Sequence, residues 1–497
     1  MVCFIWLGTI LVGILTLVFT WWKYYTRKGQ CTVDIIPGDW PLIGHLPALL
    51  DQQKFMKMSD EFHKQYEGTF GYYLATRILV VTSNQSVIED LLSSPKYNKK
   101  SWGYKMLDNF IGNGLVSSYG DLWKQRRRLI TPAFHFDILN GFLPVMERCS
   151  KELIQILGKH ACEETSFNAI NMGTKLTMAV ICETSMGYKI SLTKESQDND
   201  FKSLYENATI VMSKRFYRPW LMNDFIYSLT QDGKTFFSHR DALRNWVTSI
   251  IEERIRFRKD ETGDQNLRQP KRKIVIDVLL DAYEKGEIGV EGMVDEVTTL
   301  VFAGYETTSS NFAFSLYCLG RNPECQAKLY EEISEFGKSE NFNLDDLKRM
   351  AYLDLVIKET LRLHVTLNAF SRDIKEGTIL GGKIFPECML VVDVRNLNHN
   401  EENWDNPMSF IPERFENFDE RKKDKAFMFI PFSAGPRNCV GQRFALMELK
   451  IALFHCVKNF EFFSLQNEFE IEQTFQGVNT STNGLHLKVK RRNISSE

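Results

Sequence analysis

Residues 432–441 read Phe-Ser-Ala-Gly-Pro-Arg-Asn-Cys-Val-Gly, and this stretch decides how the chain is interpreted. Phe432 supplies an apolar wall, while Gly435 and Gly441 allow a tight turn or a close approach of the backbone to a flat ligand. Good helix formers follow Gly441. Cys439 is therefore expected just before a helix N-terminus, where free N–H groups and the helix dipole favour a thiolate over a thiol.

The composition describes an ordinary globular protein with a large core. The 497 residues are 43% hydrophobic and 25% charged, and the formal net charge of −2 gives no global field for nucleic acid. The ten cysteines contain no CxxC pair and no regular spacing. This pattern argues against a zinc site or a disulfide framework, and it fits a reducing compartment.

The N-terminus is predicted to be a membrane anchor. Residues 1–22 carry no charged side chain and would form a helix about 33 Å long, enough to cross a bilayer. Aromatic and basic residues follow at once, which keeps the downstream chain in the cytosol. We expect a transmembrane anchor at 1–22, a basic and Pro/Gly-containing hinge at 23–46, and a catalytic domain at 47–497. A cleaved signal peptide is the alternative, and it is disfavoured by the long apolar run and the lack of a basic start.

The body of the chain is predicted to be mainly helical with small β-sheets. Residues 67–82 are rich in β-branched and aromatic residues and indicate a hairpin. Helical patterns dominate from about 85 to 365, with a polar, basic linker at 262–273. Strands are expected near 377–394 and within 466–492. Such an order favours one large helical fold wrapped round a cofactor.

A long helix is expected from Gly292 to Asn322, ended by Pro323. Gly304 in its interior costs about 1 kcal/mol relative to Ala, and a close ligand approach is one possible reason. Next to it, Glu306 and Thr307 place a carboxylate beside a hydroxyl, which is a pair able to move protons. The alternatives are a Thr that bonds its own helix and a Glu on a solvated face.

The cysteine segment resembles the haem-binding loop of the cytochrome P450 family, whose pattern is Phe-x-x-Gly-x-Arg-x-Cys-x-Gly. The resemblance implies haem b held by the Cys439 thiolate as the axial iron ligand, with Phe432 and Gly441 beside it. The alternative is a buried free cysteine in an ordinary loop.

The segment from Ala303 to Thr308 resembles the oxygen-activation motif of the same family. This resemblance implies that Thr307 and Glu306 are catalytic and deliver protons to iron-bound oxygen. The chain departs from the fatty-acid ω-hydroxylase branch at Ala303, where a glutamate often bonds covalently to haem. Ala303 cannot form that ester.

Three further pieces match the family's scaffold. Glu359 and Arg362 lie three apart on one helix face and resemble its Glu-x-x-Arg motif, and Arg414 matches the third member of a structural triad. Trp123 and Arg127 resemble its Trp-x-x-x-Arg, which implies that they bind a haem propionate, as Arg437 would. The alternatives are an ordinary surface pair and a basic amphipathic helix.

The whole chain looks most similar to the family-4 branch, which is abundant in insects, on the residues 131–136 (Thr-Pro-Ala-Phe-His-Phe) and 434–439. A second departure follows Arg362, where relatives often carry a proline pair and this chain has residues 364–370 (His-Val-Thr-Leu-Asn-Ala-Phe). That stretch would border the substrate.

The resemblance implies a haem-thiolate monooxygenase that inserts one oxygen atom from O2 into a lipophilic fatty acid, hormone or xenobiotic. Because the chain has no Gly-x-Gly-x-x-Gly or phosphate loop, NADPH would act through a separate NADPH-cytochrome P450 reductase, with cytochrome b5 as an additional candidate donor. The expected location is the endoplasmic reticulum membrane. A reductase-independent haem-thiolate isomerase or dehydratase and a non-catalytic haem-binding membrane protein are the alternatives.

Overall fold

Helices carry most of the chain, and small sheets accompany them, as the sequence predicted. The computed structural model describes residues 8, 12–20, 22, 31–40, 43–50, 52–75, 77–193, 198–216, 218–261, 274–336, 344–419, 422, 425–475 and 477–492. The chain forms two compact units, each assembled from segments distant in sequence. Unit 1 comprises 1–103, 369–404 and 420–437, and unit 2 comprises 104–368, 405–419 and 438–497.

Unit 1 is built on a four-stranded sheet in the order β1-β2-β7-β4. The strands are β1 (Thr69–Leu74), β2 (Arg77–Thr82), β7 (Cys388–Asp393) and β4 (Ala369–Ile374). β1 and β2 form the predicted antiparallel hairpin, and β2 pairs in parallel with β7, so that Leu79 lies opposite Met389. Phe70, Leu79 and Val81 are buried with side chains of α3, which explains the apolar character of this hairpin.

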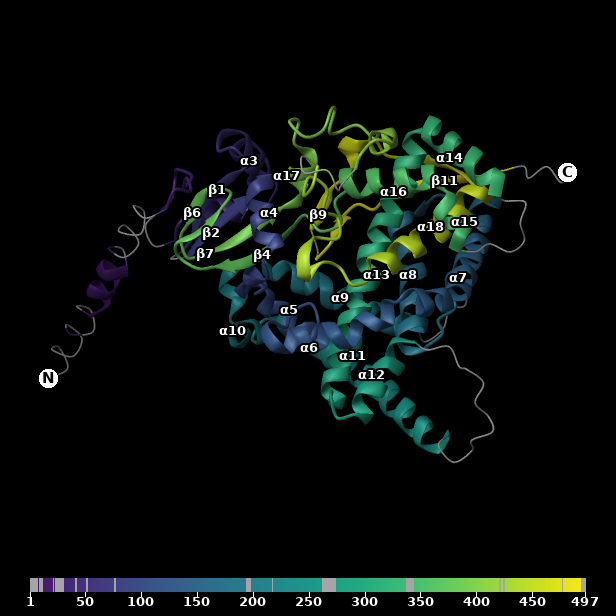
Figure 1. The fold of residues 1–497 in the computed structure, drawn as a ribbon, viewed down its shortest axis with the longest axis horizontal. Helices are drawn as coiled ribbons and strands as arrows, with labels where there is room; N and C mark the ends of the chain where they lie inside the picture. Colours follow the sequence, from purple (N-terminus) through teal and green to yellow (C-terminus); the bar gives the residue numbers. More distant parts are fainter. Residues whose placement is uncertain are drawn as a thin grey trace. The chain divides into compact units, whose positions relative to one another are not determined.

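The other elements of unit 1 are short. Strands β5 and β6 make a separate antiparallel pair, and α3 and α4 lie beside the larger sheet in Figure 1. Their bounds are α2 (Leu46–Leu49), α3 (Gln52–Gln65), α4 (Gln85–Ser93), β5 (Thr378–Leu380), β6 (Lys383–Phe385) and α17 (Val394–His399).

Unit 2 is organised round α13 (Val290–Arg321), the helix predicted over 292–322. Its neighbours in space include α8, α11 and α18, so it is buried on nearly every face. That burial explains why its apolar residues are not confined to one stripe, although Asp295 and Glu296 are buried with them. The helix stops before Pro323, which then opens α14 at a position where its missing N–H costs nothing.

The remaining helices of unit 2 surround α13 (Figure 1). They are α5 (Lys105–Ile111), α6 (Gly120–Ile130), α7 (Phe136–Cys162), α8 (Ala169–Met186), α9 (Asp198–Phe216), α10 (Asp224–Ser228), α11 (Gln231–Glu261), α12 (Val275–Glu284), α14 (Pro323–Phe336), α15 (Leu344–Arg349), α16 (Ala351–Leu363) and α18 (Gln442–Asn459). Two small antiparallel sheets join β3-β11-β8 and β10-β9. Their strands are β3 (Phe167–Asn168), β8 (Phe460–Ser464), β9 (Gln473–Phe475), β10 (Asn479–Ser481) and β11 (His486–Arg491).

Half of the predicted anchor at 1–22 and all of the linker at 262–273 lie outside the described residues. Residues 12–20 are helical, and most of their apolar side chains are exposed. Among the residues that the structure describes, no single helix has the length and hydropathy of a membrane span. The bent pair Gly120–Phe134 and Phe136–Cys162 meets that measure together, by length and composition alone.

The strand predictions are confirmed in 377–394 and in the C-terminal region, although β8 begins before residue 466. β4 was not predicted from the sequence, because its polar residues Ser371, Arg372 and Asp373 are not typical of a strand. β4 forms because its backbone pairs along its whole length with β7, and the propensity of its own side chains does not decide the outcome.

Candidate haem site

Cys439 lies just before α18, as the sequence predicted. Gly441 is the N-cap of that helix, and the backbone N–H groups of Gly441 and Gln442 hydrogen-bond to the Cys439 thiol. The surrounding protein raises the pKa of the thiol, whereas these two N–H groups and the charge of Arg127 oppose the rise. Two N–H donors directed at one sulfur favour its thiolate form, which is the form that binds iron.

Most of the other described cysteines are buried, unlike Cys439. The Cys439 side chain is exposed, whereas Cys388, Cys318 and Cys456 are buried. Cys388 sits within β7, and burial together with Cys31 and Asp373 raises the pKa of its thiol far above the usual value. A buried cysteine in a strand beside carboxylates cannot present a thiolate to a large ligand, so Cys439 is the better candidate.

Arg127 of α6 holds the cysteine loop from a distant part of the sequence. Its Nη1 donates to the Asn438 carbonyl oxygen and its Nη2 to Asn438 Oδ1, both at 2.7 Å. This two-pronged contact fixes the residue that precedes Cys439. Trp123, one turn earlier on α6, is 7% exposed. Trp123 and Arg127 are one turn apart on α6, so both could bind one haem propionate, although the Arg127 guanidinium is hydrogen-bonded to Asn438 in this structure.

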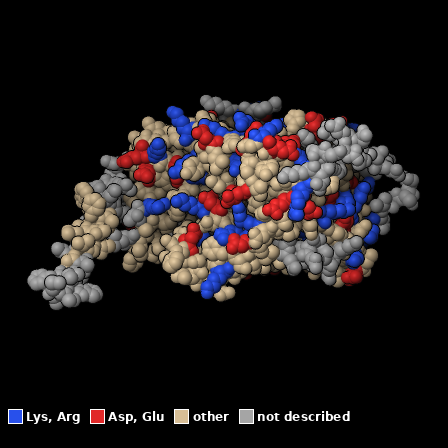
Figure 2. Space-filling model, turned by 90° about the horizontal axis from the view of Figure 1, so that it is seen from below, with Lys and Arg blue, Asp and Glu red and all other residues tan. Residues whose placement is uncertain are grey.

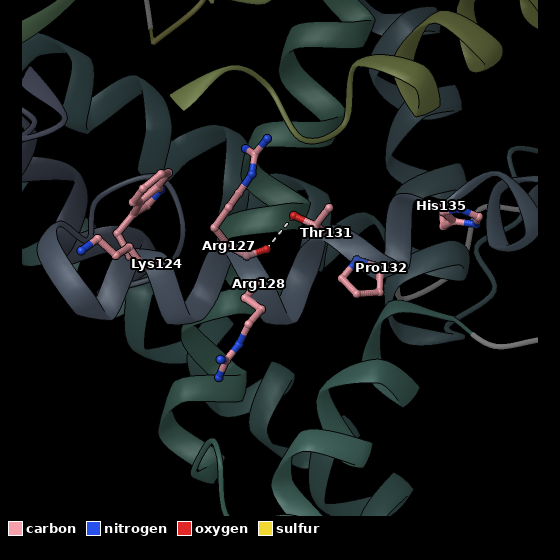
Figure 3. A pocket seen from close by; sticks show the side chains of 7 residues that line it. Lys124, Arg127, Arg128, Thr131, Pro132 and His135 are labelled. Carbon is pink, nitrogen blue, oxygen red and sulfur yellow. Dashed lines mark hydrogen bonds between the residues drawn. The ribbon is translucent and has the colours of Figure 1, made fainter. Parts of the chain in front are cut away.

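An open groove of about 630 Å³ runs along the same helix. Its lining residues are Trp123, Lys124, Arg127, Arg128, Thr131, Pro132 and His135. Figure 3 shows Arg127 and Arg128 pointing to opposite sides of α6, with the Thr131 hydroxyl donating to the Arg127 carbonyl at 2.6 Å. Lys124, Arg128 and His135 are exposed, so the rim of the groove carries basic groups.

Glu359, Arg362 and Arg414 lie together in unit 2. Glu359 and Arg362 are fully buried, and two N–H groups of Arg362 donate to the two Glu359 oxygens at 2.8 Å each. Arg414 Nε donates to Glu359 Oε1 at 2.9 Å. The remaining arginine donors bind main-chain carbonyls of 405–409. The triad therefore fastens an irregular segment to α16 and is a structural device.

The predicted catalytic pair on α13 faces two different partners. The Thr307 hydroxyl donates to the Ala303 carbonyl at 2.8 Å, and Glu306 Oε1 accepts from the Tyr305 hydroxyl at 3.2 Å. Glu306 and Thr307 share no hydrogen bond in the described structure. Burial raises the pKa of Glu306 to about 8; the Tyr305 hydroxyl and Thr209 oppose the rise, and Glu206 adds to it. A carboxyl group with this pKa is mostly protonated at pH 7.

Gly304 has a packing role that sequence reasoning missed. A Cβ at this position would lie 2.8 Å from Cδ1 and 3.0 Å from Cγ1 of Ile181 on α8. The glycine therefore allows α8 to approach α13 closely. This packing is sufficient reason for a glycine inside the helix, despite its poor helix propensity, and no ligand is needed to explain it.

The site residues of unit 1 lie in their own network. Gly435 has φ of 68°, and a Cβ there would collide with the Leu92 carbonyl oxygen, so the turn requires glycine. Phe432 is half-buried. Arg437 Nε donates to the Asn98 carbonyl oxygen at 3.1 Å. Gly441, in unit 2, has an ordinary φ of −87° and space for a Cβ, so no protein contact requires its glycine.

Two further cations of unit 1 join Arg437, and the sequence analysis did not find them. Burial lowers the pKa of Lys100 well below its usual value, and the charges of Arg372 and Arg437 lower it further. Arg372 is 2% exposed, and its backbone bridges to that of Lys100. Three cations in one place suit an anionic group such as a carboxylate. In the sequence, Lys99-Lys100 looks like a solvated charge pair, and only the fold reveals otherwise.

The comparisons with known proteins agree with this site. A family model described as cytochrome P450 matches residues 36–489. Cytochrome P450 4V2 of Homo sapiens is 33% identical, covering 94% of this chain and 92% of that protein. Cytochrome P450 4c21 of Blattella germanica is 31% identical over 92% of this chain and 93% of its own length, and cytochrome P450 4d2 of Drosophila melanogaster is 31% identical over 97% and 99%.

The fold and these matches define a haem-thiolate protein. The chain belongs to the cytochrome P450 family, a family of monooxygenases that bind haem through a cysteine thiolate and use O2, a redox partner and lipophilic substrates. The predicted resemblance to its family-4 members is confirmed. The donor set of unit 2 fits a thiolate-bound haem, because the Cys439 thiol with its two N–H donors precedes α18.

Proposed function

We propose that the chain is a membrane-bound monooxygenase whose haem is held by Cys439 and whose substrate is a fatty acid, a hormone or a xenobiotic. The observation that carries the proposal is the Cys439 thiol, exposed and bonded by the N–H groups of Gly441 and Gln442 at the start of α18. When bound, haem with a thiolate ligand supplies O2 activation. Haem binding and proton supply would be performed by the protein's own side chains.

Several residues would hold and orient the haem. Arg127 fixes Asn438 and thereby the loop that presents Cys439. By the family resemblance, Trp123, Arg127 and Arg437 would donate to its propionates. Phe432 and Gly441 would lie against it. The triad of Glu359, Arg362 and Arg414 would keep the supporting segment in place.

Glu306 and Thr307 would supply protons. Because the pKa of Glu306 is about 8, its carboxyl group holds a proton at neutral pH that it can release to an acceptor within hydrogen-bond reach. Thr307 donates its own proton to the Ala303 carbonyl, so its oxygen is left to accept a hydrogen bond from water or from Glu306. Thr307 would therefore hold a bridging water as a hydrogen-bond acceptor, and the proton of Glu306 would pass through that water.

The electron donor would be a separate NADPH-cytochrome P450 reductase, or cytochrome b5, docking at the groove along α6. The basic rim of Lys124, Arg128 and His135 supports an acidic partner there. On the face seen in Figure 2, lysines and arginines are mixed with acidic side chains. Association with the electron donor would therefore depend on a local basic patch and not on the net charge of the protein. We propose the endoplasmic reticulum membrane as the location, with residues 1–22 as the anchor, 23–46 as the hinge and 47–497 as the cytosolic catalytic domain.

The decisive experiment is the reduced, CO-bound absorption spectrum of the full chain. The expected result is a strongly red-shifted Soret band that disappears in Cys439→Ala. Cys388→Ala is the matched control and should keep the band, because Cys388 is buried within β7. Loss of the band in the control variant, or its survival in Cys439→Ala, would reject Cys439 as the ligand.

The same preparation tests the reaction. With a reductase, NADPH and a substrate found by spectral titration, one labelled oxygen atom from O2 should enter the product. Turnover that continues without reductase and NADPH would favour an isomerase or dehydratase instead.

A further inference from the structure

Part of the stretch predicted as a hinge lies along β1, which is the edge strand of the sheet in unit 1. Residues 34–45, described at 34–40 and 43–45, form what we call the strap. The Gly71 N–H of β1 donates to the Asp34 carbonyl oxygen at 2.7 Å, and the Gly71 carbonyl oxygen accepts from the Ile36 N–H at 2.9 Å. The start of the strap is therefore held to β1 by backbone pairing, as a neighbouring strand would be.

The end of the strap is held to β1 partly by a side chain. The His45 N–H donates to the Tyr73 carbonyl oxygen at 2.8 Å, and the Tyr73 N–H donates back to Nδ1 of the His45 ring at 3.1 Å. Nε2 of the same ring bonds the Ile36 carbonyl oxygen at 3.1 Å. His45 is 4% exposed and Tyr73 1% exposed. One buried imidazole therefore joins both parts of the strap to β1.

The residue before His45 allows this contact. Gly44 has φ of 62°, and a Cβ there would collide with the Tyr73 carbonyl oxygen. The backbone groups of Gly44 and Trp40 also bond each other in both directions, at 2.8 and 2.9 Å. This tight turn brings the His45 ring within reach of the Tyr73 N–H.

Only one protonation state of His45 satisfies both ring bonds. A backbone N–H can only donate, so Nδ1 must carry no proton, and a carbonyl oxygen can only accept, so Nε2 must carry one. In the imidazolium both ring nitrogens donate, so Nδ1 would face the Tyr73 N–H and leave it buried without an acceptor. The Tyr72 ring of β1 meets the His45 ring edge to face with centroids 6.3 Å apart. Within the described part of the chain, no carboxylate or cation contacts His45, so no neighbouring charge would compensate its protonation.

We propose that His45 is a protonation-sensitive latch that fastens the strap to β1. The latch is closed while the ring is neutral and opens when the ring takes up a proton, within the range of pH 5–8 in which histidine changes charge. The released chain from 34 to 45 would span up to about 40 Å. Opening would therefore lengthen the link between the predicted anchor and β1. The latch does not depend on haem or on the proposed reaction, so its failure would leave both unaffected.

The test is hydrogen–deuterium exchange of the full-length holoenzyme, followed by mass spectrometry at about pH 7.5 and about pH 5.5. Rates are corrected for the intrinsic effect of pH on exchange. In the wild type, peptides covering 34–45 and 69–75 should exchange at least about fivefold faster at the lower pH, the effect of one buried donor without a partner. Peptides from α8 in the core of unit 2 should not change, which would exclude general unfolding.

Two substitutions of His45 separate the latch from the fold. His45→Asn keeps an oxygen that can accept from Tyr73 and takes up no proton in this range, so the strap should exchange equally at both pH values. His45→Phe removes both ring bonds, so the strap should exchange fast at both. His63→Asn is the matched control, because it removes the other buried histidine described in unit 1, which bonds Ser83 and Asp393. It should keep the wild-type response.

A response to pH that is present in the wild type and in His63→Asn but absent in His45→Asn would support the latch. Equal exchange of the wild-type strap at both pH values would overturn it. So would a response of the same size in His45→Asn, or a strap in His45→Phe that is as protected at about pH 7.5 as in the wild type.

Discussion

Removing the Glu359 carboxylate should unfasten the segment of 405–414 from α16. In Glu359→Ala, Arg362 remains fully buried without its two carboxylate contacts, Arg414 loses its partner, and the Ile411 N–H loses an acceptor at 2.9 Å. The main-chain carbonyls that bind the two arginines cannot neutralise their charge. The variant therefore leaves two cations buried with no counter-charge from this site.

The size of the effect follows from that burial. Breaking a buried ion pair by removing one partner costs about 3–5 kcal/mol, because the other charge stays desolvated. At 1.4 kcal/mol per tenfold, the unfolded fraction would rise by roughly 10²–10³. Since natural domains are stable by only about 5–15 kcal/mol, much of the margin would be lost.

The measurement is denaturant unfolding of the full-length holoenzyme, together with the haem content of the purified protein. Glu413→Gln is the control, because Glu413 lies beside Arg414 in sequence but bonds Lys328 and Tyr352 at the half-exposed surface. An exposed pair of that kind contributes about 1 kcal/mol or less. If Glu359→Ala lost no more stability than Glu413→Gln, the triad would not be the fastening described here.

Three other predictions follow from particular residues. Acid-acetone extraction should release all the haem, because Ala303 offers no carboxylate for an ester; haem retained on the protein would contradict this. Gly304→Ala should lower the free energy of unfolding by up to about 2 kcal/mol, since the clash with Ile181 outweighs the better helix propensity of Ala. Adding Ile181→Val should recover part of that loss in a denaturant titration, and no recovery would mean that this contact is not the cause. Deleting residues 1–28 should move much of the protein from the membrane pellet to the supernatant after centrifugation, and unchanged pelleting would count against the anchor.

Sequence reasoning succeeded where the pattern is local. The long helix through Glu306 could be predicted because its 32 residues contain no proline and end before Pro323. The β1–β2 hairpin could be predicted because β-branched and aromatic residues are concentrated there. The position of Cys439 before a helix follows from the residues after Gly441. The triad could be predicted from the family resemblance, which supplied the long-range pairing with Arg414.

Sequence reasoning failed where distant segments decide the structure. β4 is a strand because β7 lies beside it, and the backbone of half-buried Lys100 forms a bridge with Arg372 of β4. A close ligand approach was only one possible reason for Gly304, and the sequence does not show that Ile181, far away in the chain, occupies that space. Arg126 lies in a run of basic residues, but it turns inward to Glu296, with Nε 3.5 Å from Oε1. Periodicity and motif spacing carry none of these contacts.

The pairing of β2 with β7 also sets an order for biosynthesis. Leu79 cannot pair with Met389 until that residue, about 310 positions later, has been synthesised. At 5–20 residues per second, synthesis of the intervening chain takes roughly 15–60 s. The hairpin β1–β2 is complete long before that, and its apolar edge stays without its parallel neighbour on the ribosome. An open strand edge is a template for pairing with other chains. The β1–β2 hairpin must therefore be protected from pairing with other chains until β7 has been synthesised.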